Sequence, residues 1–145
     1  MKYQFLPERI LLGHPEIDFQ HEMLFFVMTG LQRLVKKSGG RDEGIDFAHL
    51  ESIFKLIEDY TATHFAYEEE LMQTSHYQDV SNHAMEHRQF ENTMIEFAEK
   101  FVTLDDNLER VVLAKRILDF LYEWVNTHIA LSDRRFFQTM PDRKT

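Results

Sequence analysis

Residues 64–87 read HFAYEEELMQTSHYQDVSNHAMEH, and this stretch contains two pairs of polar residues four positions apart, His64 with Glu68 and His83 with His87. On a helix such pairs lie on one face, with about 5 to 6 Å between their Cβ atoms, which is close enough to share a metal ion. Imidazole nitrogens bind iron, zinc or copper, and a carboxylate among them can bridge two cations. The stretch therefore predicts two helices that turn metal ligands toward one point.

Three further residues extend this pattern on either side. His21 lies earlier in the chain, and His128 and Asp133 lie later, five positions apart. Together the seven candidates suit two metal ions rather than one. A five-residue step turns a side chain by about 140° on a regular helix, so His128 and Asp133 cannot both face inward from one. We therefore expect a π-bulge, a kink or the end of a helix between residues 128 and 133.

Apolar residues recur at three- and four-residue steps along most of the chain, which predicts amphipathic helices. Asp18 is the expected cap of the first helix, and Ser38-Gly39-Gly40 is its expected end. Four helices with short connections favour an all-α fold, an antiparallel up-down-up-down four-helix bundle that forms one domain over residues 1–145. The expected segments are an extended N-terminal arm over about 1–17 and helices over about 18–37, 46–74, 80–103 and 107–138.

The composition narrows the classes of function. The chain of 145 residues has no cysteine, which excludes disulfides, thiolate metal sites and cysteine-ligated iron–sulfur clusters. Its formal net charge of −9, from 25 acidic and 16 basic residues, disfavours binding to nucleic acid or to anionic membranes. No run of residues reaches membrane-spanning length, and the charged N-terminal segment does not resemble a secretory signal. We expect a cytoplasmic protein with no nucleic-acid partner and no membrane insertion.

The seven candidate ligands lie on the apolar stripes of their helices, so folding would bury them. Imidazoles and carboxylates buried without partners would destabilise the fold by about 1 to 3 kcal/mol per group. Two divalent cations would satisfy these groups and balance the charge of the carboxylates. His14, His49 and His76 fall outside the pattern, and we expect them to be solvated, as we do Glu69 and Glu70.

Three motifs surround the candidate ligands. They are Gly13-His14-Pro15-Glu16-Ile17-Asp18-Phe19-Gln20-His21, then His64-Phe65 followed by Glu68-Glu69-Glu70-Leu71-Met72, and Leu121-x-x-Trp124-Val125-x-x-His128. Together with the ligand series, these motifs resemble those of the hemerythrin family, in particular of bacteriohemerythrins. The resemblance covers nearly the whole chain.

This resemblance implies a non-haem di-iron centre that binds dioxygen reversibly. One iron ion would have three histidine ligands and the other only two, so the second ion would keep an open position for dioxygen. By position, His83, His87 and His128 would hold one iron ion, His21 and His64 the other, and Glu68 and Asp133 would bridge the two together with an oxo or hydroxo group.

The resemblance also implies an apolar pocket for dioxygen, because water or anions that entered it would promote oxidation of the centre. Each pocket residue, taken singly, is equally well explained as the ordinary core of a bundle. Val125 is smaller than the leucine typical of this place in the family, which would widen the pocket and quicken autoxidation. The implied pocket residues are Leu24, Phe65, Trp124 and Val125.

We expect reversible dioxygen binding rather than catalysis, for oxygen storage, delivery or sensing. The protein would act through diffusion, through a protein partner or through its own conformational change, and the sequence does not identify which. A single open position leaves little room for a larger substrate. The alternative is a di-iron oxidase or peroxidase, although ferritin-like enzymes use Glu-x-x-His pairs and the candidate ligands include none. A third hypothesis is a helical interaction module without metal, which iron content would distinguish.

Overall fold

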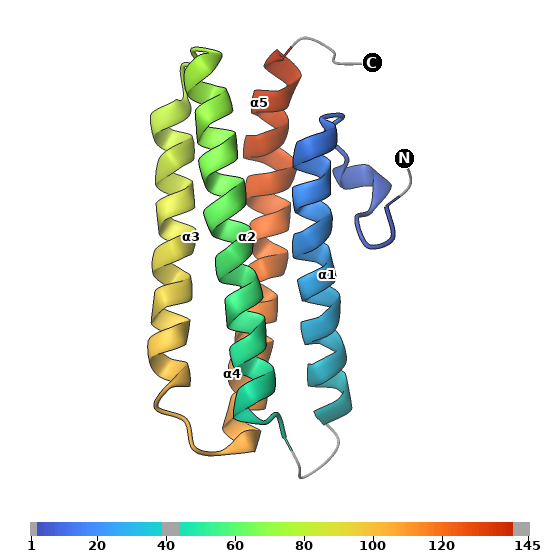
Figure 1. The fold of residues 1–145 in the computed structure, drawn as a ribbon, viewed down its shortest axis with the longest axis vertical. Helices are drawn as coiled ribbons and strands as arrows, with labels where there is room; N and C mark the ends of the chain where they lie inside the picture. The colour runs from blue at the N-terminus through green and yellow to red at the C-terminus, as the bar shows by residue number, and fades with distance from the viewer. Residues whose placement is uncertain (1–2, 39–43, 141–145) are drawn as a thin grey trace.

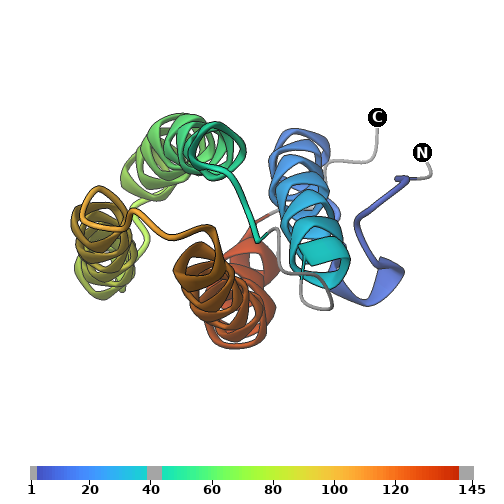
Figure 2. The ribbon, with the colours of Figure 1, turned by 90° about the horizontal axis from the view of Figure 1, so that it is seen from below.

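The computed structural model describes residues 3–38 and 44–140, and this part of the chain is all-helical, with no strand. The elements are the 3-10 turn η1 (Glu8–Ile10), α1 (Pro15–Ser38), α2 (Phe47–Thr74), α3 (Val80–Phe101), α4 (Asn107–Trp124), the π-helical segment η2 (Val125–Asp133) and α5 (Arg134–Thr139). They pack as long rods side by side (Figure 1). Seen end-on, α1 and α3 lie on opposite sides of the bundle, and each of them packs against both α2 and α4 (Figure 2). The all-α fold expected from the sequence is confirmed.

The last rod consists of three elements. α4, η2 and α5 follow one another without a break and form one column, coloured orange to red in Figure 1. The sequence predicted a helix over about 107–138 with an irregularity between residues 128 and 133, and the structure has the π-helical segment η2 across this interval. Among the helices that the structure describes, none is long and apolar enough to cross a bilayer.

Aspartate side chains cap the N-termini of two of the helices. Asp46 accepts a hydrogen bond from the backbone N–H of His49 at the start of α2, and Asp106 accepts one from Leu108 at the start of α4. Each carboxylate satisfies a donor that the helix itself leaves without a partner. The expected stop at Gly39-Gly40, the first two residues of the arm and residues 141–145 lie outside the described residues.

The first helix begins at Pro15 rather than near residue 18. Proline suits the first position of a helix, because its φ is already helical and its missing N–H has no intrahelical partner there. Nδ1 of His14 accepts a hydrogen bond from the backbone N–H of Ile17, at 3.3 Å. The prediction that Asp18 caps this helix is therefore wrong, since Asp18 lies inside the first turn.

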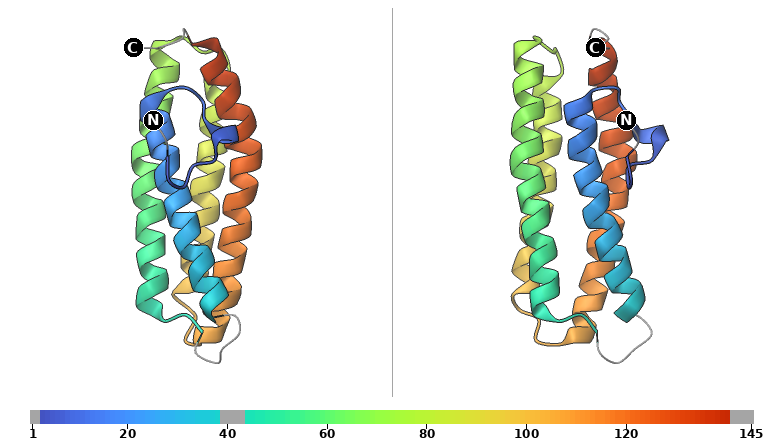
Figure 3. Two further views of the ribbon diagram at one scale, coloured as in Figure 1. Left: turned by 90° about the vertical axis from the view of Figure 1, so that its right-hand side faces the viewer. Right: turned by 45° about the vertical axis from the view of Figure 1, so that its right-hand side comes forward.

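The N-terminal segment lies against the outside of the bundle beside α1 (Figure 3), and two carboxylates of α1 bind its backbone. Asp18 accepts hydrogen bonds from the backbone N–H groups of Leu12 and Gly13, at 2.9 and 3.1 Å. Glu22 accepts one from Leu6 at 2.6 Å. Gly13 has φ of +82°, a conformation that glycine adopts at little cost, and this lets the chain turn into α1.

The buried apolar side chains form two separate clusters. The larger cluster draws on all the long rods and includes Leu24, which lies three positions after His21 on α1. The smaller cluster includes Ile17, four positions before His21. His21 and the other candidate ligands therefore occupy a polar layer between the clusters. The smaller cluster consists of Ile17, Met72, Phe136 and Phe137.

Candidate metal centre

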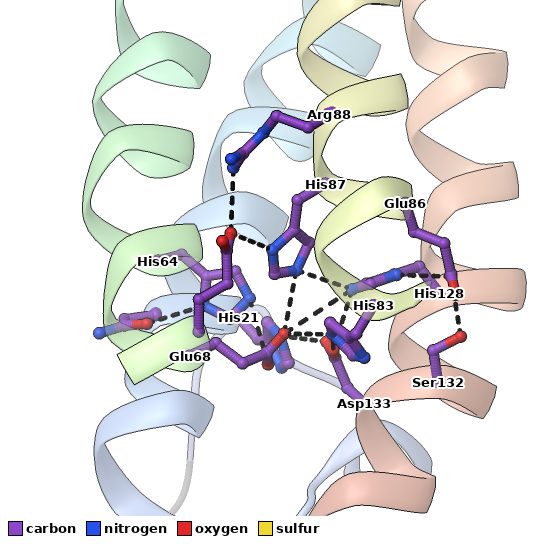
Figure 4. A network of polar contacts seen from close by, with 12 residues as sticks. His21, His64, Glu68, His83, Glu86, His87, Arg88, His128, Ser132 and Asp133 are labelled. Atoms are coloured by element: carbon purple, nitrogen blue, oxygen red, sulfur yellow. Dashed lines mark hydrogen bonds and ion pairs between the residues drawn. The ribbon is translucent and has the colours of Figure 1, made fainter. Parts of the chain in front are cut away.

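The seven candidate ligands meet at one level of the bundle (Figure 4). Each of them exposes at most 2% of its surface. Every long rod contributes at least one side chain, so the layer forms only when the rods pack together. The residues are His21 from α1, His64 and Glu68 from α2, His83 and His87 from α3, and His128 and Asp133 from η2.

The ligand atoms of this layer fall into two groups, and within each group all atoms lie within 4.8 Å of one another. One group takes an atom from each of five residues and the other from each of four. Both carboxylates belong to both groups, so the two groups share an edge. The first group is Glu68, His83, His87, His128 and Asp133, and the second is His21, His64, Glu68 and Asp133.

In the group with three histidines, the Nε2 atoms surround one oxygen of each carboxylate. Glu68 Oε1 lies 2.6 Å from Nε2 of His83 and 3.1 Å from Nε2 of His87. Asp133 Oδ1 lies 2.9 Å from Nε2 of both His83 and His128. The Nε2 atoms of His87 and His128 face each other at 3.2 Å. Adjacent ligands of an octahedral ion with bonds of about 2.1 Å lie about 3 Å apart, so these separations match atoms that bind one ion.

The group with two histidines uses the other oxygen of each carboxylate. His21 Nε2 lies 3.2 Å from Asp133 Oδ2, and His64 Nε2 lies 3.6 Å from Glu68 Oε2. The rings of His21 and His64 lie 4.8 Å apart. Glu68 and Asp133 therefore each turn one oxygen toward each group, which is how carboxylates bridge a pair of cations.

The π-helical segment brings His128 and Asp133 into the same layer. Hydrogen bonds in a π-helix run between residues five apart rather than four, and the wider turn places such residues on nearly one face. η2 spans Val125–Asp133, and both His128 and Asp133 are buried on its inner side. A regular α-helix would turn one of the two away from the interior.

Burial and the neighbouring charged groups have opposite effects on the pKa values of several residues in this layer. Burial and the charge of Asp133 raise the pKa of Glu68, but the neighbouring histidines outweigh them and lower it to about 2. Burial lowers the pKa of His83, but its contacts with Asp133 and Glu68 outweigh burial and raise it to about 9. For His64 burial dominates and lowers the pKa to about 3. The layer therefore contains ionised carboxylates and a neutral His64, which are the forms that bind cations.

Several of the buried ligand atoms have close neighbours but no hydrogen bond of good geometry among the described residues. These atoms are Nε2 of His21, Nε2 of His64, Oε2 of Glu68 and both carboxylate oxygens of Asp133. Buried polar atoms without a hydrogen-bond partner are rare in folded proteins and need an explanation. A pair of bound cations would satisfy all of them, so the donor set fits two metal ions.

Acceptors outside the layer orient the histidines. Gln20 Oε1 lies 2.7 Å from Nδ1 of His64, and Glu69 Oε2 lies 2.8 Å from Nδ1 of His87. A hydrogen on Nδ1 leaves the lone pair of Nε2 for a cation. Glu69, which was expected at the surface, is only partly exposed, with 18% of its side chain accessible, and it also binds Arg88. Glu70 is exposed, as expected.

His128 has an acceptor of the same kind. Its Nδ1 lies 2.9 Å from Oε1 of Glu86, which also accepts a hydrogen bond from Ser132 at 2.8 Å (Figure 4). The hydrogen bond with His128 lowers the pKa of Glu86, so this carboxylate is ionised. Sequence reasoning missed Glu86, as it missed Gln20. The one available signal was that each directly precedes a candidate ligand, but each serves a histidine of another helix.

The histidines outside the ligand pattern differ in exposure. His49 is exposed and lies 3.3 Å from Asp46, and His76 is also exposed, as expected. His14 is buried, with 7% of its surface exposed, so the prediction that it is solvated is wrong. Its ring packs against the ring of Phe137 on α5, with 5.3 Å between the centroids, because His14 directly precedes α1.

The four expected pocket residues are all buried beside the layer. The ring of Phe65 stacks on His87, with centroids 4.0 Å apart, and that of Trp124 stacks on His128, at 3.9 Å. Both aromatic rings therefore lie against the group with three histidines. Tyr60, which sequence reasoning did not single out, stacks on His64 at 5.0 Å. The four residues expected to line the pocket are Leu24, Phe65, Trp124 and Val125.

Comparison with known proteins agrees with this geometry. Residues 12–140 match the family described as "Hemerythrin HHE cation binding domain", and this span includes every candidate ligand. A curated relative, the "Bacteriohemerythrin" of Clostridium acetobutylicum, is 26% identical over 125 residues, which cover 86% of this chain and 92% of the relative. With a buried layer of histidines and carboxylates inside a helical bundle, the chain belongs to the hemerythrin HHE cation binding domain family.

Proposed function

We propose that this layer holds two iron ions and that the chain binds dioxygen reversibly. The observation that carries the proposal is the unequal size of the two ligand groups, five residues against four, with Glu68 and Asp133 common to both. If each ion takes six ligands and one oxo or hydroxo group bridges them, the larger group is complete. The smaller group, with His21 and His64, then keeps one position for an exogenous ligand.

Iron fits both the donor set and the relatives. Imidazole and carboxylate ligands without thiolate suit iron among several transition metals. The matched family and the curated relative are both named for hemerythrin, which favours iron over the other metals. When bound, the iron pair supplies the electrons that dioxygen takes up and later returns. The chain supplies the ligands, their orientation and the pocket.

The pocket side chains would keep water away from the open position. Leu24, Phe65 and Val125 each expose 2% or less of their surface, and Trp124 exposes 7%. Exclusion of water and anions favours the release of dioxygen over permanent oxidation of the centre. Reversible binding for storage, delivery or sensing, rather than turnover of a substrate, is the function that this environment supports best.

The arrangement of the rods belongs to the same proposal. The α2–α3 turn and the α3–α4 connection lie at opposite ends of the bundle, which supports an antiparallel up-down-up-down order (Figure 1). We propose that residues 3–14, which precede α1, act as an arm on this bundle. A cytoplasmic location, the lack of a nucleic-acid partner and the existence of a protein partner remain predictions from the sequence.

Iron content and visible spectra test the proposal. We expect two irons per chain, and a charge-transfer band that forms when the reduced protein meets air and disappears when oxygen is removed. Protein without iron, or reduced protein that gives no band in air, would contradict the proposal. A band that forms but does not reverse, with consumption of a substrate, would instead favour a di-iron oxidase or peroxidase.

A further inference from the structure

Tyr60 is a buried phenol at the edge of the ligand layer. It exposes 6% of its surface and lies four positions before His64 on α2. Its ring is nearly parallel to that imidazole, with an interplanar angle of 14° and 5.0 Å between centroids. Its hydroxyl has no hydrogen bond of good geometry with any described residue. A phenol therefore lies against a ligand of the smaller group with its polar end unsatisfied.

The indole of Trp124 adds a second buried donor in the same place. Its Nε1 also lacks a hydrogen bond of good geometry within the described part of the chain, and only 7% of the residue is exposed. An indole N–H can only donate. Even where it donates to the phenol oxygen, the hydrogen of the phenol still has no acceptor.

The surroundings of Tyr60 limit what the missing acceptor can be. The ring of Phe65 lies 6.1 Å from that of Tyr60 and 5.8 Å from that of Trp124, so apolar rings bound the space on one side. The hydroxyl of Tyr60 is therefore buried beside His64 without an acceptor in the described part of the protein, so a ligand bound beside His64 is the acceptor that this geometry offers.

We propose that Tyr60 donates a hydrogen bond to the small exogenous ligand bound beside His64, either dioxygen or a linear anion such as azide. The inference rests on the proposed di-iron function and refines it, because the pocket is then not wholly apolar but carries one directed donor. Such a donor favours ligands whose outer atom accepts a hydrogen bond over ligands whose outer atom does not.

The variant Tyr60→Phe tests this role, because it removes the hydroxyl and keeps the ring that stacks on His64. We expect the dissociation constant of azide, followed by visible titration of the oxidised protein, to rise about tenfold, since a hydrogen bond of about 1.4 kcal/mol corresponds to that factor. Autoxidation in air should quicken as well. The matched control is Tyr122→Phe, which changes a phenol that is 41% exposed on α4. It should bind azide as the unaltered protein does.

Iron content separates this inference from the proposed function. If Tyr60→Phe binds two irons and azide as tightly as the unaltered protein, the inference is wrong while the di-iron proposal stands. If the unaltered protein binds no iron, the di-iron proposal is wrong and the inference falls with it.

A measurement on the unaltered protein does not depend on the variant being stable. The tyrosine doublet in the ultraviolet resonance Raman spectrum reports hydrogen bonding of phenols, and we expect it to change when azide is added. In Tyr122→Phe the change should persist. A doublet that azide leaves unchanged would overturn the role of Tyr60.

Discussion

Gln20 on α1 accepts a hydrogen bond from Nδ1 of His64 on α2, over 2.7 Å. The same relationship recurs along the chain. Each of α1, α2 and α3 carries an acceptor directly beside one of its own candidate ligands, and that acceptor orients a histidine of the next rod. The acceptor is a neutral amide at the smaller group and a carboxylate at the larger one. The pairs are Gln20 with His64, Glu69 with His87 and Glu86 with His128.

Replacing Gln20 by alanine should weaken metal binding at the smaller group. Without the amide oxygen, His64 loses the contact that fixes its ring and its tautomer, and loss of such a partner typically lowers metal affinity by about 10- to 100-fold. Competition with a chelator should remove one iron from Gln20→Ala before the other. Gln32→Ala is the control, because Gln32 is an exposed residue of the same helix that accepts a hydrogen bond from Tyr122 and not from a candidate ligand. Equal resistance of both variants to the chelator would argue against the role of Gln20.

Removal of His64 itself has a stronger expected effect. His64→Ala leaves the smaller group with one histidine, so we expect about one iron per chain instead of two and no reversible band in air. His49→Ala alters an exposed histidine and should change neither. The measurements are iron content and the air spectrum of the reduced protein. Normal oxygen binding by His64→Ala would show that the ligand assignment is wrong.

The charge of Glu86 should tune the electron affinity of the centre. Its carboxylate makes His128 a stronger electron donor, which favours the oxidised ion, whereas glutamine keeps an acceptor and removes the charge. Glu86→Gln should therefore raise the reduction potential and slow autoxidation, as spectroelectrochemistry and air-oxidation rates would record. Glu91→Gln is the matched control, because Glu91 has the same side-chain exposure of 38% but binds Arg88. A shift of equal size in both variants would mean that only the general charge of the protein matters.

The protein stripped of metal should be most stable near pH 6.5. Glu68 and His64 have folded pKa values of about 2 and about 3, so the stability they contribute is complete above their ordinary values of 4.5 and 6.5 and is lost as the pH falls. His83, with a folded pKa of about 9, contributes stability that is complete below pH 6.5 and is lost as the pH rises.

Urea unfolding midpoints across this pH range would check the expected maximum. Iron should raise the midpoint at every pH at which it binds, because it binds the folded chain preferentially. A metal-free protein as stable as the loaded one, or one whose stability climbs steadily with pH, would contradict this account.

Local spacing made most of the ligand layer predictable. His64 with Glu68, and His83 with His87, lie one turn apart, so a helix alone places each pair on one face. The step from His128 to Asp133 does not fit a regular helix, and this misfit alone indicated an irregularity where the structure has η2. These inferences needed only the geometry of single helices.

Contacts between helices were not predictable in the same way. Gln20 and Glu86 look like ordinary polar residues until the rods are packed, because the histidines they serve lie 44 and 42 positions away. The sequence predicts a start of α1 about three residues too late, because proline is compatible with an extended arm as well as with the first position of a helix. The burial of His14 was not predicted for the same reason, because this residue directly precedes the start of α1.

The polar layer between the two hydrophobic clusters also controls how the rods align lengthwise. Apolar contacts are non-directional, so the clusters alone would tolerate a helix that slips along its neighbours. A slip of one turn moves a side chain by about 5.4 Å, which exceeds the 4.8 Å span of each ligand group. Binding of the proposed ions would therefore require the rods to be in register, because a rod displaced by one turn would carry its ligand atoms out of reach of the others.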